Sequence, residues 1–249
     1  MASTLRLVTI PSSHYCEKAR WALDRAGVPF HEDPHLPLLS WVAARRAGGR
    51  RLVPVLATPD GPVVDSTDIL AWCDAHGAAP PLFPSDQPDA RALEDELDRR
   101  LGPATRLIAY AAILPRRDAV AAVFHATPAW EGRVVGATYP IVRRLMTRML
   151  RIDAASLARA RAIVDEIFAT IARRLDGRRY LAGDRFSAAD LTFAALAAPV
   201  IAPDEYGGPL PPRDTWGDDF ASYVDRMRDT PAGRFALRLY ADERAPAAR

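Results

Sequence analysis

The sequence predicts an α/β domain followed by an all-α domain. Short apolar runs alternate with helical patterns before the segment 79–88, and only helical patterns follow it. That segment is rich in proline, which sustains neither a helix nor a central strand. We therefore expect a first domain of residues 1–78, a linker of residues 79–89 and a helical domain of residues 90–249.

The first expected strand leads directly into a helix. The apolar run Leu5–Ile10 is typical of a strand, and small or apolar residues then recur at helical spacing through Ser12–Gly27. Gly27 stands where a helix C-cap is expected. A helix N-terminus has unpaired N–H groups and a positive dipole end. The hydroxyls and the thiol of this turn therefore lie where a thiolate would be stabilised.

The next expected strand contains a proline. Leu52–Leu56 is an apolar run, but Pro54 in its middle is incompatible with an ordinary central strand. A proline at such a place marks an edge or a cis peptide bond, and we expect the bond after Val53 to be cis. The elements expected after it are a turn at 59–61, a strand at 62–64, and a helix that has Ser66 as its N-cap and ends at Gly77.

The sequence pattern after residue 89 predicts helices and no strands. The clearest one carries Ile163, Ile167 and Ile171 as an apolar stripe, and Ser187 and Asp190 have capping-box spacing before another. We therefore interpret Asp190 as a structural residue and not as a catalytic one. The expected helices cover residues 90–114 with a kink near Gly102–Pro103, 119–125, a stretch that begins at Pro140, 155–175, 187–196 and 218–227.

Charge and cysteine content exclude several classes of protein. A net charge of +2 gives no strong attraction for nucleic acid, and two cysteines make no disulfide framework. The N-terminal residues lack a signal-peptide pattern, and the apolar run 191–202 is broken by Pro199 and too short to cross a membrane. Pro34 separates His31 from His35, so we expect no metal site. A cytoplasmic protein without nucleic-acid or membrane partners is the expectation.

Four motifs together resemble the glutathione S-transferase family, in particular its serine-type, bacterial-like members. They are Ser13-His14-Tyr15-Cys16 after the first strand, Val53-Pro54, Asp65-Ser66, and the segment 180–191 around the capping box. The resemblance covers nearly the whole chain. It implies a thioredoxin-like N-terminal domain, an all-helical C-terminal domain, and glutathione as co-substrate in a reaction with a small hydrophobic electrophile.

The resemblance assigns the activation of the glutathione sulfur to Ser13, which holds the first position of the tetrad. Its hydroxyl would donate a hydrogen bond to that sulfur and favour the thiolate. Ser12 is the alternative for this role, and a plain loop serine that caps the helix is the structural interpretation. Cys16 holds the last position of the tetrad, but without a cysteine at position 13 dithiol chemistry is disfavoured. Cys16 then either packs in the first turn or takes a direct part.

The resemblance also implies the other ligands of glutathione. The backbone of Val53 beside Pro54 would bind the cysteinyl part, and Asp65 and Ser66 would bind the γ-glutamyl ammonium and carboxylate. Arg51, or its neighbour at position 50, would pair with the glycyl carboxylate.

An apolar acceptor pocket is expected beside this site. His14 and Tyr15 flank the serine and are candidates for it, as are Tyr110 and Phe124 in the helical domain. Trp130 is a further candidate, although aromatic residues of a helical domain belong equally often to its core.

Two alternatives to a glutathione-dependent enzyme stay open. One is a protein of the same fold that binds ligands or partners without catalysis. The other is an enzyme that uses a different low-molecular-weight thiol. The resemblance further implies a homodimer, with Trp72 and the stretch 90–101 in or near the contact.

Overall fold

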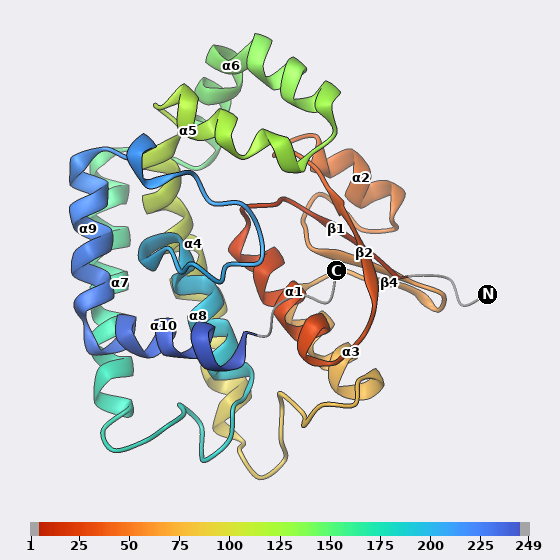
Figure 1. The fold of residues 1–249 in the computed structure, drawn as a ribbon, viewed down its shortest axis with the longest axis vertical. Helices are drawn as coiled ribbons and strands as arrows, with labels where there is room; N and C mark the ends of the chain where they lie inside the picture. Colours follow the sequence, from red (N-terminus) through yellow and green to blue (C-terminus); the bar gives the residue numbers. More distant parts are fainter. Residues whose placement is uncertain (1–4, 245–249) are drawn as a thin grey trace.

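The protein consists of a small sheet domain and a larger helical domain that lie side by side (Figure 1). The structure is a computed structural model that describes residues 5–244. It confirms the expected fold class, an α/β thioredoxin-like part followed by helices, while the limits of the two domains stay a prediction. The sheet domain contains β1 (Leu5–Thr9), α1 (His14–Arg25), β2 (Phe30–Pro34), α2 (Ser40–Arg46), β3 (Val55–Thr58), β4 (Gly61–Val63) and α3 (Ser66–His76).

The helices that follow form the second domain and the region above it in Figure 1. They are α4 (Asp89–Ile113), α5 (Arg117–Ala122), η1 (Phe124–Ala126), α6 (Ala129–Met149), α7 (Ala154–Arg174), α8 (Ala188–Ile201), η2 (Arg213–Thr215), α9 (Asp218–Asp229) and α10 (Pro231–Glu243). Among the helices described, none is both long and apolar enough to cross a membrane.

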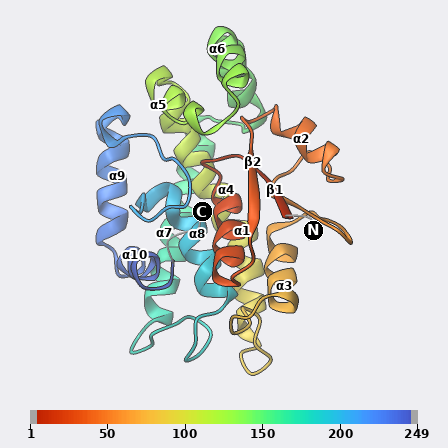
Figure 2. The ribbon, with the colours of Figure 1, turned by 45° about the vertical axis from the view of Figure 1, so that its right-hand side comes forward.

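The sheet has the strand order β2-β1-β3-β4, with β1 and β2 parallel and the other pairs antiparallel. Side chains alternate between the two faces of a strand. Leu7 and Leu56 are paired and belong to the main core, which includes residues of α1 and α3. Val8 and Val55 are paired one residue along and pack against the alanines of α2. Helices therefore cover both faces of the sheet (Figure 2).

The structure confirms a cis peptide bond between Val53 and Pro54. The strand β3 begins only after this proline, so Pro54 lies outside the ladder. The expected N-cap of α3 was wrong by one residue. Asp65 has the extended conformation of an N-cap and its carboxylate accepts from the Thr67 N–H at 2.8 Å, while Ser66 is the first helical residue.

The helix α8 is the centre of the helical domain, and almost every one of its residues is buried. The predicted capping box starts it: the Asp190 carboxylate accepts from the Ser187 N–H at 2.9 Å and from the Leu181 N–H at 2.8 Å. Burial raises the pKa of Asp190 to about 6, and these hydrogen bonds oppose that shift. The structural interpretation of Asp190 is confirmed.

The expectation that a helix begins at Pro140 was wrong, because α6 runs through this proline from Ala129. A proline inside a helix leaves the carbonyl four residues earlier without its N–H partner. Here that carbonyl belongs to Gly136, and the Arg117 guanidinium donates to it at 3.0 Å. A side chain from α5 thus replaces the missing backbone bond. The polar edge strand β2, the short α2 and the terminal α10 had no expectation attached to them.

Lys18 joins the two domains. Its ammonium donates to Thr67 Oγ1 at 3.0 Å, to Asp98 Oδ1 at 2.8 Å and to Glu94, and both Lys18 and Glu94 are fully buried. Burial raises the pKa of Glu94, and the neighbouring Lys18 partly opposes that rise. Removing one partner of such a cluster would leave a buried charge unpaired. The cluster therefore fixes α1 and α3 against α4.

Candidate functional site

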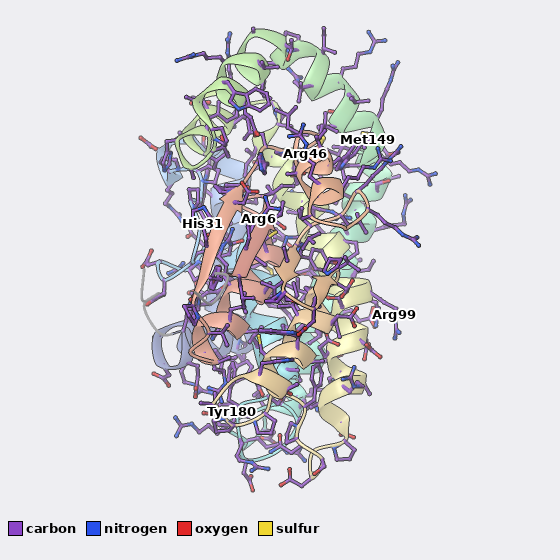
Figure 3. All side chains as sticks on the ribbon, turned by 90° about the vertical axis from the view of Figure 1, so that its right-hand side faces the viewer. Arg6, His31, Arg46, Arg99, Met149 and Tyr180 are labelled. Carbon is purple, nitrogen blue, oxygen red and sulfur yellow. The ribbon has the colours of Figure 1, made fainter. Side chains whose placement is uncertain are left out.

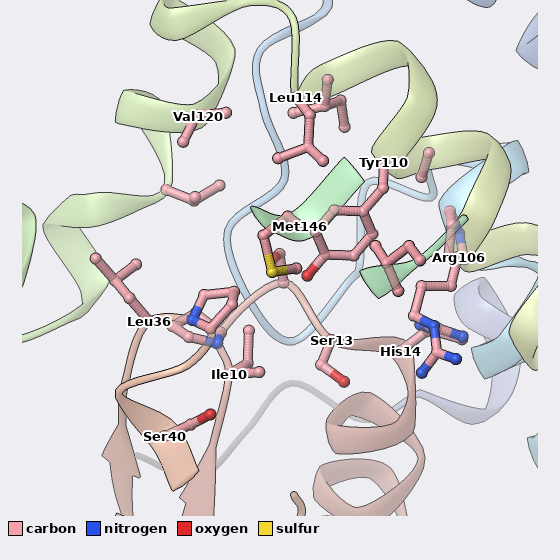
Figure 4. A pocket seen from close by; sticks show the side chains of 18 of the residues that line it. Ile10, Ser13, His14, Leu36, Ser40, Arg106, Tyr110, Leu114, Val120 and Met146 are labelled. Atoms are coloured by element: carbon pink, nitrogen blue, oxygen red, sulfur yellow. The ribbon is translucent and has the colours of Figure 1, made fainter. Parts of the chain in front are cut away.

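A cavity of about 390 Å³ lies where the two domains and the helices α5 and α6 meet. Figure 4 shows side chains from several elements converging on it. We call the strand-to-helix turn 10–15 its floor and the segment 117–149 its roof, while α4 forms a wall between them. The cavity is lined mainly by apolar side chains, among them Ile10, Leu36, Ile113, Val120, Val135, Met146, Pro199 and Trp216.

Ser13 is placed at the floor of this cavity as the N-cap of α1. Its Oγ accepts from the Cys16 N–H at 3.4 Å, which leaves its own hydroxyl proton free to donate. The turn is held from behind, because Arg20 donates to the Pro11 carbonyl at 2.9 Å and Tyr206 donates to the Ser12 carbonyl at 3.1 Å. Ser12 also lines the cavity, so the choice between the two hydroxyls stays a prediction.

Cys16 is fully buried behind Ser13. Its sulfur accepts from the Ile10 N–H at 3.5 Å, and burial raises the pKa of its thiol. A raised pKa disfavours the reactive thiolate. These observations favour the packing interpretation of Cys16.

His14 and Tyr15 line the cavity, but their polar atoms are used by α4. His14 Nε2 donates to the Gly102 carbonyl at 2.9 Å, and the Tyr15 hydroxyl donates to the Asp98 carbonyl at 2.9 Å. Burial lowers the pKa of His14 to about 3 and raises that of Tyr15, so both rings stay neutral near pH 7. A Cβ on Gly102 would lie 2.1 Å from the Tyr15 hydroxyl, which explains why this helical position has no side chain.

The predicted glutathione ligands fall into two groups. Val53 and Arg51 line the cavity, and the Arg51 guanidinium lies 5.6 Å from the centre of the Trp41 ring. Pro54, Asp65 and Ser66 are outside its lining, with Ser66 buried at the start of α3 and Asp65 exposed. Their roles in binding glutathione stay predictions.

The predicted acceptor residues of the helical domain also separate. Tyr110 and Phe124 line the cavity, from α4 and from the roof, and burial raises the pKa of Tyr110. Trp130 is outside the lining and is 54% exposed on α6. Of the roof, only Phe124 and Trp130 were predicted as pocket residues, and of these two Phe124 alone lines the cavity.

The roof is attached to the sheet domain through Glu131. This carboxylate is buried, accepts from the Leu36 N–H at 2.7 Å and contacts His35 Nδ1. On the other side, the Tyr139 hydroxyl donates to the Leu114 carbonyl at 2.6 Å. A loop of the sheet domain and the end of α4 thus hold α6 over the cavity.

Arg106 is the charged residue of the cavity lining that the sequence analysis missed. It lies on α4, four residues from Gly102 and four from Tyr110, and residues at this spacing share one face of a helix. That spacing is the signal that could have found it. Within residues 5–244, no group of three His, Cys, Asp or Glu side chains is arranged to hold a metal ion.

Comparison with known proteins connects both domains to one family. Residues 7–81 match a model of the glutathione S-transferase N-terminal domain, and residues 154–235 match one of the glutathione S-transferase C-terminal domain. A search of curated proteins found no match.

Several solved structures are similar over nearly the whole chain. A glutathione S-transferase from Methylobacterium radiotolerans, in complex with glutathione sulfonate, is 26% identical over 94% of this chain and 95% of its own, with a TM-score of 0.52. A glutathione S-transferase from Ceriporiopsis subvermispora, in complex with glutathione, is 16% identical over 99% and 100%, with a TM-score of 0.64. A β-etherase from Sphingobium sp. strain SYK-6 is 19% identical over 94% and 99%, with a TM-score of 0.60.

Proposed function

Because this chain belongs to the glutathione S-transferase family, we propose that it is an enzyme that activates glutathione at Ser13 and transfers it to a small apolar electrophile. The observation that carries the proposal is the position of the Ser13 hydroxyl. It stands at the N-terminus of α1, at the floor of a cavity whose other walls are mainly apolar.

The chemistry follows from this position. A free thiol has a pKa of about 8.5, so only a small fraction is thiolate at neutral pH. A hydroxyl that donates to the sulfur and the positive end of a helix both favour the thiolate, and each unit of pKa is worth about 1.4 kcal/mol. The thiolate then attacks the electrophile in the cavity, where apolar walls reduce the competition from water.

Glutathione itself would lie along the sheet domain. We assign its cysteinyl part to the backbone of Val53, its γ-glutamyl group to Asp65 and Ser66, and its glycyl carboxylate to Arg51. The support is that Val53 and Arg51 line the same cavity as Ser13, and that Ser66 stands at a helix N-terminus, where anions bind. The similar structure from Methylobacterium radiotolerans contains glutathione sulfonate, and that from Ceriporiopsis subvermispora contains glutathione.

The test is the substitution Ser13→Ala, with Ser12→Ala as its matched control. Removing a donor to a developing anion costs about 10²- to 10³-fold in kcat. We therefore expect Ser13→Ala to slow turnover of a general electrophile by this order and to raise the pKa of bound glutathione, followed by thiolate absorbance. Glutathione affinity, measured by calorimetry, should change little.

Four results would revise this proposal. Equal turnover and equal thiol pKa in Ser13→Ala would make Ser13 a loop residue, and a larger effect of Ser12→Ala would move the role to its neighbour. Binding of glutathione without turnover of any electrophile would favour the non-catalytic alternative. Failure to bind glutathione at all would point to a different thiol.

We also propose a homodimer in which Trp72 and the first turns of α4 lie in or near the contact. Trp72 is half-buried and stacks on His76, with ring centres 4.1 Å apart. A monomeric mass in light scattering at micromolar concentration would contradict it.

A further inference from the structure

Arg106 places a positive charge at the α4 wall of a cavity that is lined mainly by apolar side chains. It is half-buried on α4, and among the residues that the structure describes no carboxylate forms an ion pair with it. A charge that is partly shielded from water is stabilised further by an opposite charge or by hydrogen-bond acceptors. Because the described residues supply no such carboxylate, the position suits an anion that enters the cavity from outside the chain.

Within residues 5–244, the cations that are more fully buried than Arg106 each have such a partner within the chain. Lys18, Arg20 and Arg244 are buried, and each forms ion pairs with carboxylates. The pairs are Lys18 with Glu94 and Asp98, Arg20 with Glu17 and Glu32, and Arg244 with Glu17 and Asp24. Arg106 differs from them in lining a cavity and in having no carboxylate of its own.

The Arg106 guanidinium lies close enough to the floor of the cavity to act on its residues electrostatically. Figure 4 shows its side chain descending from α4 to end beside His14, on the same side of the cavity as Ser13. Its field helps to lower the pKa of His14 and opposes the rise in the pKa values of Tyr15 and Tyr110. An anion bound here would therefore lie close to the reacting sulfur.

The two carboxylates of glutathione are assigned elsewhere in the proposed function, on which this inference rests. Their ligands, Arg51 and Ser66, belong to the sheet domain, whereas Arg106 shares the α4 wall with Tyr110. We propose that Arg106 binds a carboxylate carried by the acceptor substrate, so that the preferred electrophiles are apolar acids.

Para-chloro-meta-nitrobenzoate and its methyl ester are suitable probes, because they differ in this charge. In both, the glutathione thiolate forms a bond to the ring carbon that bears chlorine, and chloride leaves with the electron pair of the broken bond. The carboxylate or ester takes no part, and no oxidant or reductant is needed. The ratio of kcat/KM for acid over ester then measures the contribution of the charge within each variant, because intrinsic reactivity cancels between variants.

The experiment compares Arg106→Met, Arg106→Lys and the control Arg99→Met. A hydrogen bond to a charged group corresponds to about a 10- to 100-fold effect. We expect Arg106→Met to lower the acid-to-ester ratio by this factor and Arg106→Lys to retain most of it. Arg99 lies on the same helix but is exposed and projects away from the protein (Figure 3), so Arg99→Met should leave the ratio unchanged.

The outcomes separate this inference from the proposed function. Turnover of the ester with an unchanged acid-to-ester ratio in Arg106→Met would overturn the inference and leave the proposed function intact. If neither probe is turned over, competition between the acid and a fluorescent apolar ligand still tests the site. Tighter binding of the acid than of the ester in the unsubstituted protein, lost in Arg106→Met and kept in Arg106→Lys, would support the inference without the reaction. Equal binding would overturn it.

Discussion

The floor and the roof of the cavity are held in the protein by different kinds of contact. The floor follows β1, whose inward residues Leu7 and Val8 are fully buried between helices. The roof contributes α6, on which large apolar side chains remain exposed along one face, including Ile141 at 70%. Its attachment depends on a few polar bonds, above all those of Glu131. In the proposed function, the activating hydroxyl would therefore stand on a rigid base, while the wall of the acceptor pocket would be free to move.

In the proposed reaction, the floor and the roof would have different tasks: the floor positions the thiolate, and the roof admits the apolar substrate. A thiolate must be placed to within fractions of an ångström of its donor, and packed strands and helices achieve this best. A pocket that admits apolar molecules of several shapes is better served by a loosely anchored wall. Movement of such a wall is a common way to admit a substrate and release a product.

Of the three tests of this comparison, Glu131→Ala should have the largest effect, and the effect should be confined to the roof. The substitution leaves the Leu36 N–H and His35 Nδ1 without their acceptor, while His35 Nε2 keeps Asp33, and each lost bond is worth about 1–3 kcal/mol. We expect the acceptor KM to rise at least 10-fold and amide exchange of residues 117–149 to accelerate. Calorimetry should find glutathione affinity unchanged. Asp118→Ala, which removes an exposed carboxylate of α5, is the control. A loss of glutathione affinity in Glu131→Ala as large as its loss of acceptor affinity would contradict the distinction between floor and roof.

On the floor side, Ser66→Ala should weaken glutathione binding more than Arg51→Ala. Ser66 is buried, so a lost hydrogen bond to a carboxylate costs about 1.5–3 kcal/mol there. Arg51 is exposed, and an exposed ion pair contributes about 1 kcal/mol at most. Calorimetry with both variants measures the difference. Equal or reversed losses would show that the γ-glutamyl carboxylate lies elsewhere.

The smallest effect concerns His14, which connects the floor to α4. Burial lowers its pKa to about 3, whereas in the unfolded chain it takes up a proton below about pH 6.5. The unfolded state therefore binds more protons in acid, and stability falls by about 1.4 kcal/mol for each pH unit below 6.5. His14→Gln has no such titration. Urea unfolding at about pH 6.5 and 5.5 should show the steeper decline in the unsubstituted protein, and parallel declines would mean that His14 is protonated in the folded state.

The floor, and the cis bond of the same domain, could be predicted from the sequence because their signals are local. Ser13 before a helix and Pro54 after an apolar residue are each interpretable within a few positions, and the structure has the cap and the cis bond where they were expected. The roof has no such signals. Pro140 was taken for a helix start because the Arg117 side chain that replaces its backbone bond comes from another helix.

Arg106 was missed for a related reason. The chain is rich in arginine, and nothing in the neighbouring residues distinguishes this one from those in solvent. Its significance depends on an absent partner and on a cavity assembled from distant segments. Likewise, Asp65 and Ser66 were both recognised, but which of them caps α3 depends on one backbone conformation.

The cluster around Lys18 has a practical consequence for labelling the protein. Lys18 is the single lysine of the chain, and its side chain is fully enclosed between α1, α3 and α4. Apart from the α-amino group, reagents that acylate primary amines therefore meet no accessible target in the folded protein. Acylation of Lys18 requires the two domains to separate locally. Mass spectrometry can follow how fast a peptide containing Lys18 gains the label. This rate measures local opening at the domain junction without an engineered probe.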